Sequence, residues 1–440
     1  MNYASSPTTL NPVDEKTAYR PKRKFEYNLE GLRGLAALVV AWFHAVSIGR
    51  MVDAQYTLSG AWAYPVPGHL SVLLFFILSG YVIGITNPAP LAGQAVGAYL
   101  KKRFVRIYPI YAVALLLTWV VAQPYPPAQW LAHFSLTQVL LAPMINENAP
   151  AWSLHYEALY YLLFIPLSVW RVNAWAAAGA CFLLGLFNQL MWPANTLLTS
   201  YSYGFTFWLC GLGLAQNDSS RERRYTAQLL VALLLLFLSM RYFNVFETLL
   251  LKGTHFAVGQ RLHYWAGAEQ FRSVITFADL AFLPVGVVYL LVFTNQDFPG
   301  RRVVLRVLFG LPAATFLYLG LHYHELDLRL YYLPAAFYVA AVMLAAVPLA
   351  RMEAVAARTM QRLVELGGIS YGLYIIHFPI MTGLKQVTVF SGTGFAYAVR
   401  CALALLLSVL LAHFLEKKFQ PLVRKLLKSR EPELLRSKPY

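Results

Sequence analysis

An arginine and a histidine share one face of the first apolar segment, EGLRGLAALVVAWFHA. Arg33 and His44 are eleven residues apart, which is close to three helical turns and corresponds to about 16 Å along a helix axis. An ionisable side chain within a membrane span is a candidate for function, because its charge is costly in lipid. The spacing leaves a second interpretation open, in which His44 is hydrogen-bonded inside a bundle and Arg33 anchors the helix end.

A carboxylate is expected at the depth of His44 on another segment. Glu157 lies five residues after Trp152 in AWSLHYEALYY, which places it about 8 Å below the outer end of that segment. Counting back from Gly49 gives His44 nearly the same depth. A carboxylate beside an imidazole orients the ring and stabilises the imidazolium that proton uptake creates. We therefore expect His44 and Glu157 to form an acid–base pair; the alternative is that Glu157 pairs with a structural arginine.

Two further arginines precede an apolar segment in KKRFVRIYP. Arg103 and Arg106 are three residues apart and share a face if the helix begins this early. Their planar guanidinium groups suit phosphate oxygens, although composition alone favours ordinary anchoring at a membrane surface. Ser79 and Gly80 in LLFFILSGYVIG form a small pair that permits close helix packing or leaves room for a ligand. We place Ser79 with the arginines in a candidate cofactor site.

A polar stripe runs along the segment GGISYGLYIIHFP near the C-terminus. Tyr374 and His377 are i,i+3 neighbours, and Ser370 lies one heptad before His377. Polar groups within lipid must face protein or water. We expect Tyr371, Tyr374 and His377, together with Trp152, to contact substrate. For His377 alone, a packing role is the stronger interpretation.

The composition indicates that most of this chain lies within a lipid bilayer. Of its 440 residues, 58% are hydrophobic and only 13% are charged, against about 25% charged in soluble domains. Apolar runs near the length of a bilayer core predict an all-α, polytopic transmembrane bundle of about 10–12 spans. The twelve candidates are Gly31–Gly49, Gly68–Thr86, Ile107–Gln123, Trp152–Val169, Val172–Met191, Thr199–Gln216, Thr226–Phe243, Ile275–Phe293, Val303–His322, Leu330–Ala350, Ile369–Leu384 and Ala396–Leu415.

The formal charge of +16 is explained by basic clusters between the spans. The strong clusters fall on alternate connections and beside both chain ends, which predicts that both termini are cytoplasmic. Nucleic-acid binding is disfavoured, because it needs a soluble basic face. We expect a disordered cytoplasmic tail without a removable signal peptide at residues 1–29, a transmembrane catalytic domain at 30–415, and a basic amphipathic cytoplasmic tail at 416–440 that binds an anionic membrane surface.

No metal site is expected from the spacing of potential ligands. The three cysteines lie within apolar segments at irregular spacing, which is typical of small core residues. An HxH pair occurs at His322–His324, but its acidic neighbours fall in a short turn.

Five motifs in order resemble the acyltransferase 3 family of membrane O-acyltransferases, which modify lipopolysaccharide, peptidoglycan and other glycans. They are GLRGLAALVVAWFH, FFILSGYVI, RFVRIYP, WSLHYEALYYLLF and ISYGLYIIHFP, with LEKKFQPLVRK resembling the charged end of the family. Each motif is loose, whereas the ordered set is specific, and the region from about Val172 to Val364 matches in hydropathy alone. Glu30 stands where an aspartate is common, and the twelve expected spans exceed the usual core of ten.

The resemblance implies a coenzyme A thioester, acetyl-CoA by default, as the acyl donor. Arg33, Arg103 and Arg106 would hold its phosphates at the cytoplasmic face, and the pantetheine arm would run along the first span. His44 would act as general base on an acceptor hydroxyl with Glu157 beside it, or would carry the acyl group as an acyl-histidine.

The implied acceptor is a carbohydrate of the cell envelope or an exported one, and the implied location is a bacterial cytoplasmic membrane. The esterase-like domain that is fused to some family members is not seen in this sequence, which leaves the acceptor open. The oligomeric state is open as well. A flippase for a lipid-linked saccharide is the principal alternative, although no inverted repeat is visible. A sensor or assembly factor without activity is a third hypothesis.

Overall fold

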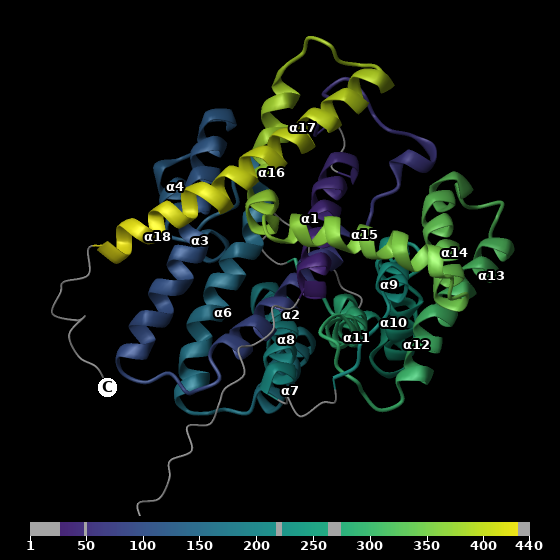
Figure 1. The fold of residues 1–440 in the computed structure, drawn as a ribbon, viewed down its shortest axis with the longest axis horizontal. Coiled ribbons are helices and arrows are strands. Elements are labelled where there is room, and N and C mark those ends of the chain that lie inside the picture. The colour runs from purple at the N-terminus through teal and green to yellow at the C-terminus, as the bar shows by residue number, and fades with distance from the viewer. Residues whose placement is uncertain (1–26, 48–50, 217–221, 263–273, 430–440) are drawn as a thin grey trace, which may run out of the picture.

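The computed structural model describes residues 27–47, 51–216, 222–262 and 274–429, and these residues form an α-helical bundle (Figure 1). Within them, β pairing is limited to one isolated bridge between Glu222 and Gln296. The all-α expectation is thus confirmed. The first half of the chain forms α1 (Tyr27–Ser47), η1 (Gly60–Ala63), α2 (Gly68–Thr86), α3 (Gln94–Val121), α4 (Pro127–Phe134), α5 (Gln138–Leu141), η2 (Asn146–Ala151), α6 (Trp152–Val169), α7 (Ala174–Met191) and α8 (Thr196–Gln216).

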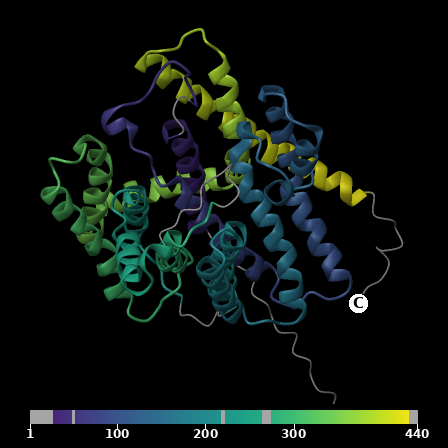
Figure 2. The ribbon, with the colours of Figure 1, turned by 180° about the vertical axis from the view of Figure 1, so that it is seen from behind.

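The second half continues the bundle and ends in a long helical rod. Its elements are α9 (Ala227–Ser239), α10 (Val245–Val258), η3 (Gly259–Leu262), η5 (Ala278–Phe282), α11 (Leu283–Phe293), α12 (Arg301–Gly310), η6 (Leu311–Ala313), α13 (Ala314–Leu321), η7 (Leu328–Tyr331), α14 (Tyr332–Ala346), α15 (Ala350–Gly367), α16 (Ser370–Gln386), α17 (Gly394–Phe414), the π-helical turn η8 (Leu415–Phe419) and α18 (Gln420–Ser429). In both views, α9 to α14 lie on one side of α1 and α2, and α3 and α6 lie on the other (Figures 1 and 2).

Each of the twelve expected spans coincides with at least one helix, but not every helix can cross a bilayer alone. Among the described residues, seven helical stretches are long and apolar enough to do so, and an eighth is gained if the bent pair α15 and α16 counts as one. The segment Val303–His322 contains two helices, α12 and α13, joined by a 3₁₀ turn at Pro312. The number of spans and the side of each terminus remain predictions.

Two helices were not expected from the sequence. Helix α10 lies between the expected spans Thr226–Phe243 and Ile275–Phe293, and α15 lies between the expected spans Leu330–Ala350 and Ile369–Leu384. Helix α15 carries charged residues and lies across the bundle at 72° to α16, over α1 (Figure 1). Its carboxylate at Glu353 accepts hydrogen bonds from the backbone N–H groups of Ala227 and Gln228, each at 2.8 Å, and so caps α9.

Reciprocal glycines set the closest helix crossings. A Cβ at Gly80 of α2 would lie 1.9 Å from the carbonyl oxygen of Trp208, and one at Gly211 of α8 would lie 1.9 Å from that of Ile77. The same holds for Gly34 of α1, whose Cβ would lie 2.1 Å from the carbonyl oxygen of Leu363 in α15. These backbones touch where any side chain would separate them. The crossings therefore fix α2, which carries Ser79, and α1, which carries Arg33 and His44.

The two chain ends differ from the expected domain boundaries. Helix α1 begins at Tyr27, so the last three residues of the expected tail 1–29 are helical, and Leu29 is buried; the rest of that tail lies outside the described residues. Residues 416–429 of the expected tail 416–440 continue α17 through η8 into α18, one long rod in Figure 1, and the rest of that tail lies outside the described residues. Gln420 binds the backbone carbonyl of Arg106 at 2.6 Å, so this rod packs on α3.

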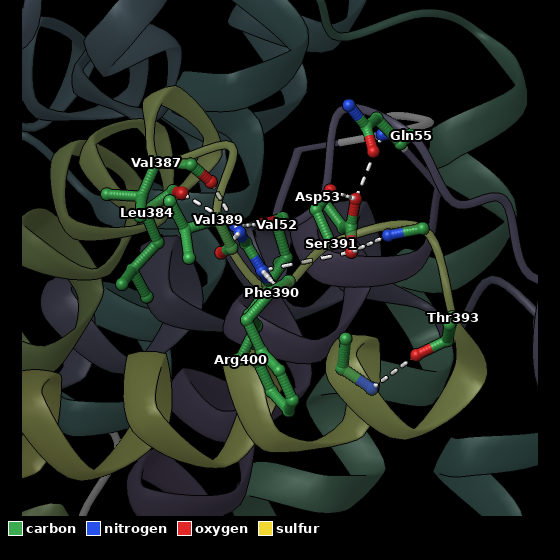
Figure 3. A network of polar contacts seen from close by, with 12 residues as sticks. Val52, Asp53, Gln55, Leu384, Val387, Val389, Phe390, Ser391, Thr393 and Arg400 are labelled. Carbon is green, nitrogen blue, oxygen red and sulfur yellow. Dashed lines mark hydrogen bonds and ion pairs between the residues drawn. The ribbon is translucent and has the colours of Figure 1, made fainter.

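A buried arginine ties the loop between α16 and α17 to the loop after α1 (Figure 3). The guanidinium of Arg400 donates to the backbone carbonyl groups of Val52, Leu384, Val387, Val389 and Phe390. Asp53 lies 3.8 Å from Arg400 and is itself fully buried. Because one buried guanidinium binds carbonyl groups of both loops, Arg400 holds this end of the bundle together. Sequence analysis singled out neither Arg400 nor Asp53.

Candidate functional site

One cavity gathers most of the predicted cofactor residues. It has a volume of about 240 Å³ and is lined by Arg33, Ser79, Arg103 and Arg106, and also by Tyr371. Arg33 comes from α1, Ser79 from α2, and the other two arginines from α3, so three helices supply them. We call this space the arginine cavity. The four residues that the sequence assigned to a cofactor site thus share one cavity.

Two of these arginines are held by carboxylates from outside the cavity lining. Arg33 Nη1 lies 3.1 Å from Glu30 Oε1, and Arg106 Nη1 lies 2.8 Å from Glu416 Oε2. Glu416 also accepts the backbone N–H of Gly372 at 3.1 Å, so it joins the π-helical turn η8 to α3 and α16. These contacts fix the direction of each guanidinium while leaving part of its hydrogen-bonding capacity free.

Unsatisfied donors indicate what the arginine cavity could bind. The Nε–H groups of Arg33 and Arg103 are buried without a hydrogen-bond partner. Arg103 has no carboxylate partner among the described residues; its guanidinium packs over the rings of Tyr99 and Tyr161 and lies 3.3 Å from Thr86 Oγ1. A buried donor without an acceptor costs about 1–3 kcal/mol, and an anionic ligand with several oxygens would remove that cost.

The structure separates Glu157 from His44, contrary to the expected pair. Glu157 lines the arginine cavity, where its Oε1 accepts hydrogen bonds from Ser79 Oγ at 2.9 Å and from the hydroxyl of Tyr161. The depth estimate located Glu157 along α6 but gave no information on the direction of its side chain. Helix α6 presents this carboxylate to Ser79 of α2, and His44 of α1 finds another partner.

His44 lines a second cavity, of about 390 Å³. Trp152, one of the expected substrate contacts, lines it too, and Tyr374 lines both cavities. We call this space the histidine cavity. Val72 is the other residue that lines both, so these two side chains form a shared wall. The hydroxyl of Tyr374 is held by Ser153 Oγ at 2.7 Å and donates to the carbonyl of Pro150 at 3.1 Å.

The partner of His44 is His377. His44 Nδ1 lies 2.8 Å from His377 Nε2, and the two ring planes differ by only 21° with centroids 5.1 Å apart, so the rings meet edge to edge. His377 Nδ1 lies 3.1 Å from the carbonyl oxygen of Leu373, which can only accept. In the neutral pair, His377 therefore carries its proton on Nδ1 and accepts from the Nδ1–H of His44. This leaves Nε2 of His44 unprotonated, as a base or nucleophile requires.

His377 does not contact either cavity, which agrees with the packing role favoured for it and not with the expected substrate contact. Its side chain is fully buried and lines neither cavity. It orients His44, which is the task that the sequence analysis gave to Glu157. Tyr371 lies on the arginine cavity with its hydroxyl bound to the carbonyl of Ile107 at 2.8 Å, and it packs beneath the guanidinium of Arg106.

Several charged residues at these cavities were missed by the sequence analysis. Lys102 and Arg424 line the arginine cavity, and His69 and Asp279 line the histidine cavity. Lys102 belongs to the KKRFVR cluster and Arg424 to the basic tail. The sequence therefore shows that both segments are basic, but not where these two side chains point. His69 stands ten residues before Ser79, and nothing in the sequence connects it to Asp279. Among the described residues, no group of three potential ligands could hold a metal ion.

Comparison with known proteins places the chain among acyltransferases. The family profile described as an acyltransferase domain, that of acyltransferase 3, matches residues 26–265, more than half of the chain. The chain is 30% identical over 171 residues to acyltransferase MdmB of Streptomyces mycarofaciens, a match covering 34% of this chain and 43% of that protein. It is 37% identical over 157 residues to protein 2 in the picA locus of Rhizobium radiobacter, covering 29% of this chain and 75% of that protein. No solved structure matches.

Proposed function

Because the chain belongs to the acyltransferase 3 family, we propose that it is a multi-pass membrane O-acyltransferase. It moves an acyl group, acetyl by default, from a coenzyme A thioester onto a hydroxyl of a cell-envelope or exported carbohydrate. The observation that carries this proposal is the pair of cavities that share Val72 and Tyr374, with cations lining one and a histidine with a free ring nitrogen lining the other.

The donor phosphates bind in the arginine cavity in this proposal. The buried Nε–H groups of Arg33 and Arg103 lack acceptors, and phosphate oxygens accept from guanidinium groups in fork geometry. Arg106 is fixed by Glu416 and Tyr371 packs against it. The cavity faces the cytosol, because coenzyme A is cytosolic and the positive-inside rule places the Lys101–Arg106 cluster there. The thioester extends past Ser79 and Glu157 towards the shared wall.

His44 performs the proton transfer. Its free Nε2 takes the proton of the acceptor hydroxyl while the hydroxyl oxygen attacks the thioester carbonyl carbon. The carbon–sulfur bond then breaks, and the proton passes from His44 to the leaving thiolate. His377 accepts the Nδ1–H of His44 throughout, which favours the imidazolium. In the two-step form, His44 Nε2 itself attacks the thioester carbonyl carbon, the carbon–sulfur bond breaks and the thiolate leaves. The acceptor oxygen then takes the acyl group as the nitrogen–carbon bond breaks, and the hydroxyl proton passes through the freed Nε2 to the thiolate.

The acceptor enters from the histidine cavity, where Trp152 supplies an aromatic face suited to a sugar ring. The location is a bacterial cytoplasmic membrane, in keeping with the two bacterial relatives. MdmB is itself named an acyltransferase. The matched region spans less than half the length of that relative, so its activity supports the proposed reaction class and says nothing about the acceptor.

Mass spectrometry of cell-envelope glycans and exported small molecules tests the proposal. Three strains are compared: a deletion strain, the deletion strain complemented with the wild-type chain, and the same strain complemented with His44→Ala. We expect an acyl ester that is lost on deletion, restored by the wild type and not restored by His44→Ala at equal membrane abundance. A flippase would instead leave an unacylated saccharide on the wrong side of the membrane in the deletion strain. If no acyl ester changes, the proposal is wrong.

A further inference from the structure

A second histidine in the histidine cavity is oriented by a carboxylate. His69 Nε2 lies 3.0 Å from Asp279 Oδ1. The other oxygen of Asp279 accepts the backbone N–H of Thr276 at 2.7 Å and the Thr276 hydroxyl at 3.1 Å. With both oxygens engaged, the carboxylate has a fixed direction. The chain thus contains the imidazole–carboxylate pair that was expected at His44 and Glu157, but from α2 and η5.

The pair determines which nitrogen of His69 carries the proton. An ionised Asp279 can only accept, so Nε2 of His69 donates to it. In the neutral ring, Nδ1 then has a free lone pair. Among the described residues, no group forms a hydrogen bond with this nitrogen, and His69 lines the cavity. When both rings are neutral, the cavity holds two oriented imidazoles, His44 and His69, each with one unprotonated nitrogen.

The two imidazoles lie on helices that touch at this level. A Cβ at Gly68, directly before His69, would lie 2.4 Å from the Cβ of Phe43, directly before His44. Trp152 stacks on His69 with ring centroids 6.3 Å apart and planes at 27°. Arg241 and Glu247 line the same cavity, so hydrogen-bond donors and acceptors surround an aromatic face.

We propose that His69, oriented by Asp279, binds a second hydroxyl of the acceptor while His44 takes the proton from the reacting hydroxyl. This inference rests on the proposed function and narrows its substrate class to polyhydroxylated rings. A buried site built to accept from a hydroxyl discriminates strongly against a compound that cannot donate there. A simple alcohol leaves His69 Nδ1 without its partner, and so does a ring whose second hydroxyl is methylated.

Asp279→Asn should reverse the direction of the hydrogen bond between His69 Nδ1 and the acceptor molecule. The backbone N–H of Thr276 still needs an acceptor, so the amide oxygen of the asparagine takes that position and its NH₂ group turns towards His69 Nε2. His69 Nε2 must then accept, and its proton moves to Nδ1, which becomes a donor into the cavity. A methoxy oxygen can accept from this donor, whereas a methoxy group cannot donate to the wild-type nitrogen.

The test uses the full-length protein in lipid nanodiscs with acetyl-CoA as donor. The acceptors are methyl glucoside, its mono-O-methyl derivatives and cyclohexanol, and thiol release without acceptor measures hydrolysis. The wild type should prefer the glucoside over cyclohexanol, and over at least one O-methyl derivative, by about tenfold or more in kcat/KM. His69→Ala should lose this preference because the KM for the glucoside rises. His69→Asn keeps a hydrogen-bond acceptor near the position of Nδ1 and should retain much of the preference. Asp279→Asn should prefer, over the glucoside, the O-methyl derivative that the wild type uses poorly.

The matched control is Asp327→Asn, which changes an exposed aspartate paired with Arg329 and should behave as the wild type. Three results would overturn the inference: no discrimination among the acceptors, no acetylation of any of them above hydrolysis, or an equal loss of transfer and hydrolysis in Asp279→Asn. The last result would place the pair in the chemical step. The proposed function fails separately, if His44→Ala retains transfer.

Discussion

The arginine cavity and the histidine cavity are built in different ways. The first takes its arginines from two short motifs on α1 and α3 and retains buried donors without acceptors, at Arg33 and Arg103. In the second, both imidazoles are paired with residues far away in the chain, His44 with His377 and His69 with Asp279. A site for anions can thus be recognised from local charge, whereas the hydrogen-bond partners that orient a proton-transferring side chain are decided by the fold.

The largest effect is expected where a pairing is removed, at His377. His377→Ala should lower kcat for acyl transfer by about 10²-fold, because His44 loses the group that fixes its tautomer and stabilises its imidazolium. His377→Gln places an amide oxygen near the position of Nε2 and can still accept the Nδ1–H of His44. We expect it to recover a large part of the loss. The measurement is kcat with saturating acetyl-CoA.

The KM for acetyl-CoA separates this role from direct substrate contact, and it should change little in either His377 variant. A rise in KM without a fall in kcat would mean that His377 contacts the donor, and the distinction between the two cavities would lose its main support.

The arginine cavity should respond in KM. Arg103→Ala removes a charged donor that has no carboxylate partner among the described residues, and the loss of about 1.5–3 kcal/mol corresponds to a rise in the KM for acetyl-CoA of about 10- to 100-fold. Arg103→Lys keeps the charge but loses the planar fork, so an intermediate KM is expected. Initial rates at varied acetyl-CoA concentration measure both. A fall in kcat at unchanged KM would contradict the assignment.

The helices and the arginine cluster could be predicted from the sequence, because long apolar runs and local charge are properties of neighbouring residues. Helix α15 could not, since its charged composition resembles a connection and its helical state depends on docking across α1 at Gly34. The partner of His44 was missed because the depth of a residue along a helix can be counted from the sequence. The direction of its side chain depends on how α1, α6 and α16 are each rotated about their own axes, which the sequence does not show. The pair of His69 and Asp279, separated by more than 200 residues, had no sequence signal.

A smaller effect, on stability, is expected at the end of the bundle held by Arg400. Burial alone would raise the pKa of Asp53, but hydrogen bonds from Ser391 and from the backbone N–H groups of Gln55 and Gly392, together with Arg400, hold it below its usual value. Asp53→Asn should therefore lower the free energy of unfolding by about 1–3 kcal/mol at neutral pH. Thermal unfolding of the two proteins in the same nanodiscs measures the difference.

The pH dependence of that difference follows from the direction of the pKa shift. A lowered folded-state pKa gives stabilisation that is complete above the unfolded-state pKa, about 4, and that is lost as pH falls through the folded-state value. The wild type should thus lose its advantage over Asp53→Asn below about pH 4. An advantage that persists at lower pH would show that shape complementarity, not the charge of Asp53, stabilises this end. Acetyl-CoA KM at neutral pH should be unaffected, because Asp53 lines neither described cavity.

The smallest effect is expected at the rim of the arginine cavity. Arg424 of α18 lines this cavity close enough to Lys102 for the two charges to repel, and its side chain is exposed. Solvent screens such a charge, so Arg424→Ala should raise the KM for acetyl-CoA by only about two- to fivefold, and by less at high salt. Arg329→Ala, an exposed arginine outside both cavities, is the matched control. An effect of Arg424→Ala as large as that of Arg103→Ala would mean that the C-terminal helix closes over the donor and that Arg424 contacts it directly.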